Sequence, residues 1–245
     1  MNKTQILIAL VILSIFGVIS TYLDVHKIWS QDDQPATKER KLRHGEIKQY
    51  TKDKRLKTVV NYDNGIKHGT SYLYHNDGKT VLLAMPYNQG KREGVSKKYY
   101  QNGKLYAATT YKNDVLHGPR QIYYTSGELK AEIMYGYGKP GIGSKEFLKD
   151  GTQKPENKIV ATKLRNSFSL STSEECKESK FYIGKLIEDN FFDPLHPDVK
   201  LLTKEDATYI VDLNLYTPSY LKYQDIICEC DSKQGNTIIM KTRLY

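Results

Sequence analysis

Two interleaved series of tight turns, repeated at one period, constrain the fold of this chain more than any other feature. Recurring glycines stand 24 or 25 residues apart, at Gly45, Gly69, Gly94, Gly118 and Gly143. Each is followed after eight or nine residues by a turn sequence: Asp53-Lys54, Asp77-Gly78, Asn102-Gly103, Ser126-Gly127 and Asp150-Gly151. About eleven residues later comes a second turn: Asp63-Asn64-Gly65, Asn88-Gln89-Gly90, Asn113-Asp114 and Gly136-Tyr137-Gly138. Because Asn-Gly, Asp-Gly and Ser-Gly supply the positive φ of hairpin turns, each unit is predicted to be one β-hairpin.

The segments between these turns are rich in Tyr, Val, Ile, Leu and Thr, which favours an antiparallel meander that grows along one axis. Of 245 residues, 20 are Tyr, against 6 Phe and 1 Trp. One set of rings recurs in the first half of the unit, at Tyr50, Tyr74, Tyr100, Tyr124 and Phe147. A second set recurs in the second half, at Tyr62, Tyr87, Tyr111 and Tyr135. Both sets are predicted to stack into ladders along a thin sheet, so that most of the rings serve the scaffold.

The unit G-x-x-x-x-Y-x-x-[DN]-G-[KE]-L, followed by Y-x-N-G-x-x-H-G, resembles the MORN repeat in the variant found in bacterial YwqK-type antitoxin proteins. The resemblance covers about residues 41–151, and the first, second and fifth units depart from the pattern. It implies an elongated β-sheet rod used for binding. In bacterial members it also implies neutralisation of a toxin or effector, and some relatives bind phospholipids.

The N-terminus is predicted to be an export or anchoring segment. Thr4 to Leu23 carries no charge and follows Lys3, so residues 1–23 have the length of either a cleaved signal peptide or a signal-anchor helix. Residues 24–40 are predicted to be a linker. We therefore expect an extracytoplasmic body, in the periplasm or at the cell surface, which is either anchored by this helix or released by cleavage.

The positive charge of the chain lies in the repeats. Residues 38–154 contain 23 Lys and Arg against 11 Asp and Glu, within a net charge of +9 for the whole chain. Lysine and tyrosine are interleaved in KKYYQNGKLY and RQIYYTSGEL, which suits an acidic protein surface or lipid phosphates. Nucleic acid fits the charge but not the expected compartment. The candidate binding residues are Lys97, Tyr99, Tyr100, Lys104, Arg120, Tyr123 and Tyr124.

The sequence offers no pattern that indicates an enzyme, a cofactor or a metal. His44, His68 and His117 recur at one repeat position, and translation along a rod does not bring ligands together. His196 lies between two prolines in DPLHPD, which predicts a rigid loop. Nucleophile-elbow, zincin and P-loop motifs are absent from the sequence.

The period stops after Gly151, and residues 155–245 are predicted to form a small β-rich or α+β domain that caps the last repeat of the 41–154 repeat domain. Alternating segments occur at KIVATKL, KFYIGKLI, ATYIVDLNLY, LKYQDIICEC and NTIIMKTRLY. An exported body permits one disulfide, which joins Cys176 with Cys228 or with Cys230.

Two functions follow as expectations. The first is an exported or membrane-anchored protein that binds another protein, as an antitoxin or immunity protein that neutralises a toxin or secreted effector. The second is an envelope scaffold whose basic repeat sheet lies on anionic lipid.

Overall fold

The computed structural model describes residues 42–174, 176–205 and 208–245. Nearly all regular structure in these ranges is antiparallel β-strand, and the helix α2 (Pro218–Leu221) has four residues. The predicted mainly β meander of hairpins is thereby confirmed. The predicted N-terminal hydrophobic helix lies outside the described residues. Within the described ranges, no helix combines the length and the apolar character needed to cross a membrane.

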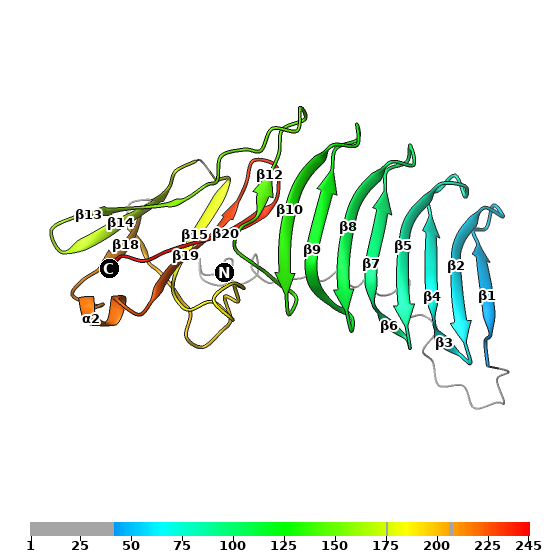
Figure 1. The fold of residues 1–245 in the computed structure, drawn as a ribbon, viewed down its shortest axis with the longest axis horizontal. Helices are drawn as coiled ribbons and strands as arrows, with labels where there is room; N and C mark the ends of the chain where they lie inside the picture. The colour runs from blue at the N-terminus through cyan, green and yellow to red at the C-terminus, as the bar shows by residue number, and fades with distance from the viewer. Residues whose placement is uncertain (1–41, 175, 206–207) are drawn as a thin grey trace, which may run out of the picture. The chain divides into compact units, whose positions relative to one another are not determined.

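The repeats form one 12-stranded sheet in which the long strands follow one another in sequence order (Figure 1). The first four predicted units each contribute a hairpin, whereas the fifth contributes only β12, which pairs with β10. Short strands continue three of the turns. The strands are β1 (Gly45–Tyr50), β2 (Leu56–Asp63), β3 (Ile66–Lys67), β4 (Gly69–Tyr74), β5 (Val81–Asn88), β6 (Lys91–Arg92), β7 (Gly94–Tyr99), β8 (Leu105–Lys112), β9 (Val115–Tyr123), β10 (Leu129–Gly136), β11 (Lys139–Pro140) and β12 (Lys145–Glu146).

Turn residues at both predicted series have the backbone conformation that the sequence requires. In the second series two successive residues have positive φ, as in Asn64 (49°) with Gly65 (84°) and Asn113 (48°) with Asp114 (68°). This pattern is that of a type I′ turn, whose twist matches the twist of the flanking strands. The recurring glycines that open each unit also have positive φ, between 75° and 101°, which explains why the period is marked by glycine.

One face of the repeat sheet is more buried than the other, and we call it the inner face. The strand register shows which residues lie on it. One row of paired residues runs from β2 to β12 on this face, and most of its members are buried or half-buried. Because the members are paired residue by residue, they share one face of the pleat. The row consists of Thr58, Leu73, Leu83, Lys98, Ala107, Ile122, Ala131 and Glu146.

The first tyrosine ladder differs from the prediction, because its members occupy two different positions of the unit. Tyr50 and Tyr74 end their strands and pair with Leu56 and Val81. Their equivalents are Tyr99 and Tyr123, which pair with Leu105 and Leu129. Tyr100 and Tyr124 come one residue later, outside the strands, so the four predicted members do not form one stack.

Tyr100 and Tyr124 link successive repeats through their hydroxyl groups. The Tyr100 hydroxyl donates to the Tyr123 carbonyl at 2.8 Å, and the Tyr124 hydroxyl donates to the Phe147 carbonyl at 2.8 Å. In the second unit, His75 Nε2 lies 3.2 Å from the carbonyl of Tyr99 at the same position. One side chain in each of the second, third and fourth units thus contacts a carbonyl of the next unit.

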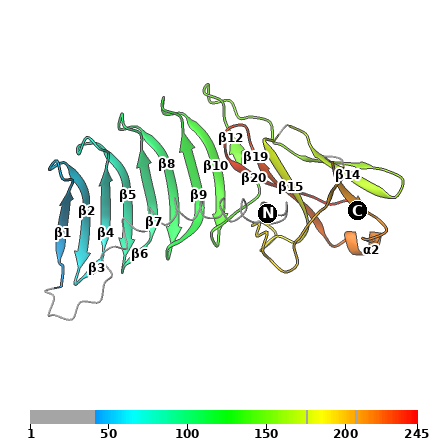
Figure 2. The ribbon, with the colours of Figure 1, turned by 180° about the vertical axis from the view of Figure 1, so that it is seen from behind.

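Residues 159–242 form two four-stranded sheets whose facing sides enclose a common core (Figure 2). The largest buried side chains of this core include Phe168, Phe181, Val211 and Ile226. The strand orders are β13-β14-β18-β17 and β16-β15-β19-β20. The strands are β13 (Ile159–Lys163), β14 (Ser167–Thr172), β15 (Glu178–Gly184), β16 (Lys200–Leu201), β17 (Lys204–Glu205), β18 (Thr208–Asp212), β19 (Asp225–Asp231) and β20 (Thr237–Thr242).

The sheet that contains β19 is covered on both faces. Ile226 and Cys228 face the core between the two sheets, whereas Ile227 belongs to a second cluster with Tyr182 and Phe192. Burial on both faces explains the continuous apolar run of β19, since alternation is expected only where one face meets water. The sequence prediction missed β14, whose serines and threonines alternate with only two apolar residues.

Residues of the C-terminal part pack on the last repeat. The second cluster includes Ile142, which forms a parallel bridge with Ile239. The ring of Phe191 packs so closely on Gly136 that a Cβ there would lie 2.5 Å from it. The Tyr137 hydroxyl donates to Glu188 Oε1 at 2.6 Å. These contacts lie at the end of the fourth unit and at the start of the fifth, which departs from the repeat pattern.

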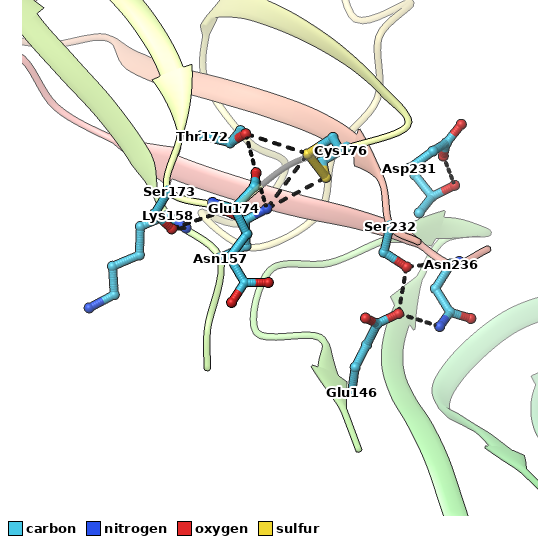
Figure 3. The surroundings of a disulfide bond; sticks show 12 residues. Glu146, Asn157, Lys158, Thr172, Ser173, Glu174, Cys176, Asp231, Ser232 and Asn236 are labelled. Carbon is cyan, nitrogen blue, oxygen red and sulfur yellow. Dashed lines mark hydrogen bonds between the residues drawn. A yellow bond between two sulfur atoms is a disulfide. The ribbon is translucent and has the colours of Figure 1, made fainter. Parts of the chain in front are cut away.

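The disulfide joins Cys176 to Cys230, one of the two predicted pairings (Figure 3). It closes a separation of 54 residues and ties the segment before β15 to β19. In the chain-entropy model, a loop of this length stabilises the folded state by about 4 kcal/mol. Cys228 remains a buried thiol, and burial raises its pKa to about 12, with a further contribution from the Glu229 carboxylate.

Candidate protein-binding face

The outer face of the repeat sheet brings tyrosine and lysine side chains together. The first strands of the hairpins, β1, β4, β7 and β9, each place two long side chains on this face, two residues apart. We call this surface the tyrosine–lysine face. It is formed by Lys48, Tyr50, Tyr72, Tyr74, Lys97, Tyr99, Gln121 and Tyr123.

The second strands of the hairpins place shorter side chains between them. Lys97 pairs with Ala84 on one side and with Ala108 on the other. Tyr72 likewise lies between Val59 and Ala84. Because adjacent strands lie about 4.8 Å apart, long side chains recur about every 10 Å with shallow troughs between them. Such a corrugated surface can receive side chains of a partner in its troughs.

The side chains of this face are accessible to a partner. Lys48 and Lys97 are exposed, Tyr50 keeps 58% of its surface, and Tyr72, Tyr74, Tyr99 and Tyr123 are half-buried. A half-buried ring adds apolar contact area at little cost in side-chain entropy, which makes tyrosine a frequent anchor of interfaces. The Glu46 carboxylate lies 3.0 Å from Lys48 Nζ and raises the pKa of that lysine. Among the described residues, no acidic side chain forms an ion pair with Lys97.

Hydrogen bonds hold part of this face in place. The Tyr123 hydroxyl donates to Gln121 Oε1 at 3.0 Å, and Gln121 Nε2 donates to Glu132 Oε2 at 2.9 Å. The three side chains lie on neighbouring positions of β9 and β10. This chain of bonds fixes the Tyr123 ring, so binding would cost it little conformational entropy.

The structure places only part of the predicted site on one face. Lys97, Tyr99 and Tyr123 lie on the tyrosine–lysine face, whereas Tyr100 and Tyr124 bond the next repeat. Lys104 Nζ donates to the Ser126 carbonyl at 2.6 Å. Arg120 pairs with Thr109 and Ile133 on the inner face, and its buried Nε has no acceptor among the described residues.

Sequence reasoning also left out five residues of this face, namely Gln121 and four residues of the first two units. Lys48, Tyr50, Tyr72 and Tyr74 belong to the first two units, whose turns and pattern are less regular. They stand three or five residues after Gly45 and Gly69, as Lys97 and Tyr99 stand after Gly94. Counting from the recurring glycine would have placed them in the candidate set.

A row of cations and tyrosines runs along the strand ends near the second turns. The Arg43 guanidinium lies 5.5 Å from the Tyr62 ring centre, and the Arg92 guanidinium lies 4.6 Å from that of Tyr111. Lys67 stands in the same way 5.6 Å from Tyr87, whose pKa burial raises to about 12. These are three of the four rings of the second predicted ladder, and their contacts with cations stabilise the scaffold.

A cleft of about 740 Å³ opens beside the last repeat, between Ile142–Glu146, residues 153–159 and β20. Its lining holds five lysines and three glutamates, so charges of both signs are present with a small positive excess. The Glu146 carboxylate is already bonded within the fold, to Ser232 Oγ and Asn236 Nδ2, both at 2.6 Å (Figure 3). Lys154 Nζ lies 3.4 Å from its other oxygen. The cleft is therefore a weaker candidate for a binding site than the tyrosine–lysine face.

Comparison with known families bears on the repeats alone. A family model described as a MORN repeat variant matches residues 92–113 and 116–136. No curated protein matches the chain significantly. The matched residues span the third and fourth units, from β6 to β10, and carry Lys97, Tyr99 and Tyr123. Residues 92–136 thus contain two copies of the MORN repeat variant.

Proposed function

We propose that this chain is a binding protein that captures another protein on the tyrosine–lysine face of its repeat sheet. The observation that carries the proposal is the row of accessible tyrosines and lysines on this face. Alanines separate these long side chains, and several other polar side chains of the repeats bond within the fold. Lys97 forms no ion pair with an acidic side chain among the described residues, which favours a partner whose contact surface is acidic. Rings that are already half-buried and partly fixed favour a lasting contact over a purely electrostatic encounter.

In its more specific form, the proposal is that the chain is an antitoxin or immunity protein. It rests on the resemblance of the repeats to those of the YwqK-type antitoxin proteins and on the charge-free N-terminal segment. The partner would be a toxin or secreted effector that acts outside the cytoplasm. Binding alone would neutralise it, so the chain needs no catalytic group.

The test is co-expression of the chain with a toxic protein encoded beside it. We expect the wild-type chain to restore growth and the double variant Lys97→Glu/Tyr99→Ala to weaken the complex about tenfold or more, as loss of a central anchor does. Lys163→Glu is the matched control, because Lys163 is an exposed strand lysine in the C-terminal part. Failure of the wild-type chain to bind or protect would contradict the antitoxin proposal. Equal protection by the double variant would contradict the choice of face.

The positive charge of the repeats supports a second candidate, binding to anionic lipid. Several of these lysines lie in the turns, at Lys52, Lys54, Lys79 and Lys149, and therefore off the tyrosine–lysine face. Flotation with vesicles of phosphatidylglycerol and phosphatidylcholine tests it. Binding that needs phosphatidylglycerol, falls steeply with salt and survives Tyr99→Ala would favour the lipid function.

A further inference from the structure

The two ends of the repeat sheet differ in how their strand edges are covered. At the C-terminal end, β10 pairs with β11 and β12, and residues of the C-terminal part pack beyond them. At the N-terminal end, β1 pairs with β2 alone among the described residues. An open edge strand offers unpaired N–H and C=O groups, which pair readily with another strand.

The backbone of β1 directs every second residue towards this open edge. The Gly65 N–H donates to the Arg43 carbonyl at 2.7 Å, and the Thr51 N–H donates to the Arg55 carbonyl at 2.8 Å. Odd-numbered residues of the strand therefore face β2, and His44, Glu46, Lys48 and Tyr50 direct their backbone groups outward. In the second unit, the equivalent His68 N–H does find a partner, the Asn61 carbonyl of the preceding strand, at 3.0 Å.

The sequence of β1 is complementary to itself about Ile47. If two copies pair antiparallel on a two-fold axis through Ile47, Glu46 of each lies opposite Lys48 of the other. His44 lies opposite Tyr50 in the same register, and these four positions are the ones whose backbone groups point outward. Opposite charges placed directly across a strand pair are stabilising, and the symmetry provides two such pairs.

This charge pattern is confined to the edge. The equivalents of Glu46 and Lys48 are Thr70 and Tyr72 in β4, and Val95 and Lys97 in β7. In β9 they are Pro119 and Gln121. Exposed edges usually carry a lone lysine or a proline that blocks pairing. In β1 the lysine is matched by a glutamate on the same face, 3.0 Å away.

From these observations we propose that β1 is a dimerisation edge, at which two copies of this chain join their repeat sheets into one continuous antiparallel sheet. The occupant of the edge is a second copy because the charges match in the two-fold register. The dimer would place two tyrosine–lysine faces side by side on one surface. The formation of the dimer does not depend on what that face binds.

Charge exchange in the full-length protein tests the proposal. We expect sedimentation equilibrium to give a dimer, and Glu46→Lys or Lys48→Glu alone to weaken it about tenfold, because each puts like charges opposite one another. The double variant Glu46→Lys/Lys48→Glu again places opposite charges across the strand pair. The dissociation constant of its dimer should therefore return to within a few-fold of the wild-type value. A monomeric wild-type chain, or a double variant as weak as the single ones, would overturn the proposal.

A cross-linking experiment tests the register independently of the charges. Ile47 lies opposite its own copy at a position whose backbone groups face away from the partner, where side chains are closest. Ile47→Cys should therefore give a disulfide-linked dimer on mild oxidation of the full-length chain. Val95→Cys is the control, since Val95 is 48% exposed on the internal strand β7. Equal cross-linking of the two variants would contradict the proposed register.

Discussion

Single side chains in this protein connect repeats that the backbone already places next to one another. The hydroxyls of Tyr100 and Tyr124 each reach the carbonyl at the end of the next unit's first strand. They therefore bond a group that the strand ladder leaves without a partner at the strand end. The same ring also fills space, as the edge-to-face contact of Tyr100 with Tyr106 shows, at a centroid distance of 5.1 Å.

Removal of one of these hydroxyls should destabilise the repeats while leaving the packing intact. We expect Tyr100→Phe and Tyr124→Phe each to lower the free energy of unfolding by about 1 kcal/mol, the net value of a hydrogen bond. Tyr50→Phe is the matched control, because Tyr50 is 58% exposed and its hydroxyl has no partner among the described residues. Urea unfolding followed by circular dichroism measures all three. Equal losses in the three variants would contradict the role of the hydroxyl bond.

At the scale of the strands and turns, glycines at equivalent positions of the repeat are needed for different reasons. One is needed only because its φ is positive, and another also because a side chain would have no room. Gly78 and Gly103 open equivalent turns with φ of 67° and 80°. A Cβ on Gly78 would lie 2.9 Å from both Arg55 Cβ and Leu56 N, whereas a Cβ on Gly103 meets nothing within 4 Å. The turn at Gly78 therefore packs against the preceding hairpin, and the turn at Gly103 does not.

The two glycines should respond differently to the same substitution. We expect Gly103→Ala to cost about 1 kcal/mol, the strain of an L-residue at positive φ. Gly78→Ala should cost clearly more, about 2 to 3 kcal/mol, because the new methyl group also displaces backbone of the neighbouring hairpin. Thermal and urea unfolding compare the pair directly. A smaller loss for Gly78→Ala than for Gly103→Ala would show that the neighbouring hairpin moves aside.

At the scale of the whole described molecule, a buried carboxylate joins the repeat sheet to the C-terminal part. Glu146 is 7% exposed in β12, at the end of the inner row, and its hydrogen-bond partners Ser232 and Asn236 flank the β19–β20 turn. Gln234 Nε2 from the same turn donates to the Phe147 carbonyl at 3.1 Å. The last repeat is thus closed by polar contacts as well as by the apolar cluster around Ile142.

Loss of this carboxylate should loosen the junction. We expect Glu146→Ala to lower the free energy of unfolding by about 3 kcal/mol, since it leaves Ser232, Asn236 and Lys154 without their shared acceptor. Unfolding of the repeats and of the C-terminal part should then separate into two transitions. Glu178→Ala, which removes an exposed carboxylate, serves as control and should change stability by less than about 0.5 kcal/mol. A single, unshifted transition for Glu146→Ala would contradict the assigned role.

The repeat part of the fold could be predicted from the sequence because its determinants are local and periodic. Positive φ at Gly65 or Gly90 is a property of the residue and its neighbours, and it recurs at one spacing. Strand order then follows from the succession of hairpins. Alternation along a strand likewise places Lys97 and Tyr99 on one face.

Contacts between residues far apart in the sequence could not be predicted, because they depend on how the folded strands pack. The one-residue offset between Tyr74 and Tyr100 depends on where each strand ends. Cys228 and Cys230 share one face of β19, and the register of β15 on β19 places Cys230 beside Cys176. The inward position of Arg120 and the pairing of Glu146 with Ser232 likewise arise from packing between strands. Local turn chemistry is encoded at every repeat, whereas such contacts arise once and leave no period in the sequence.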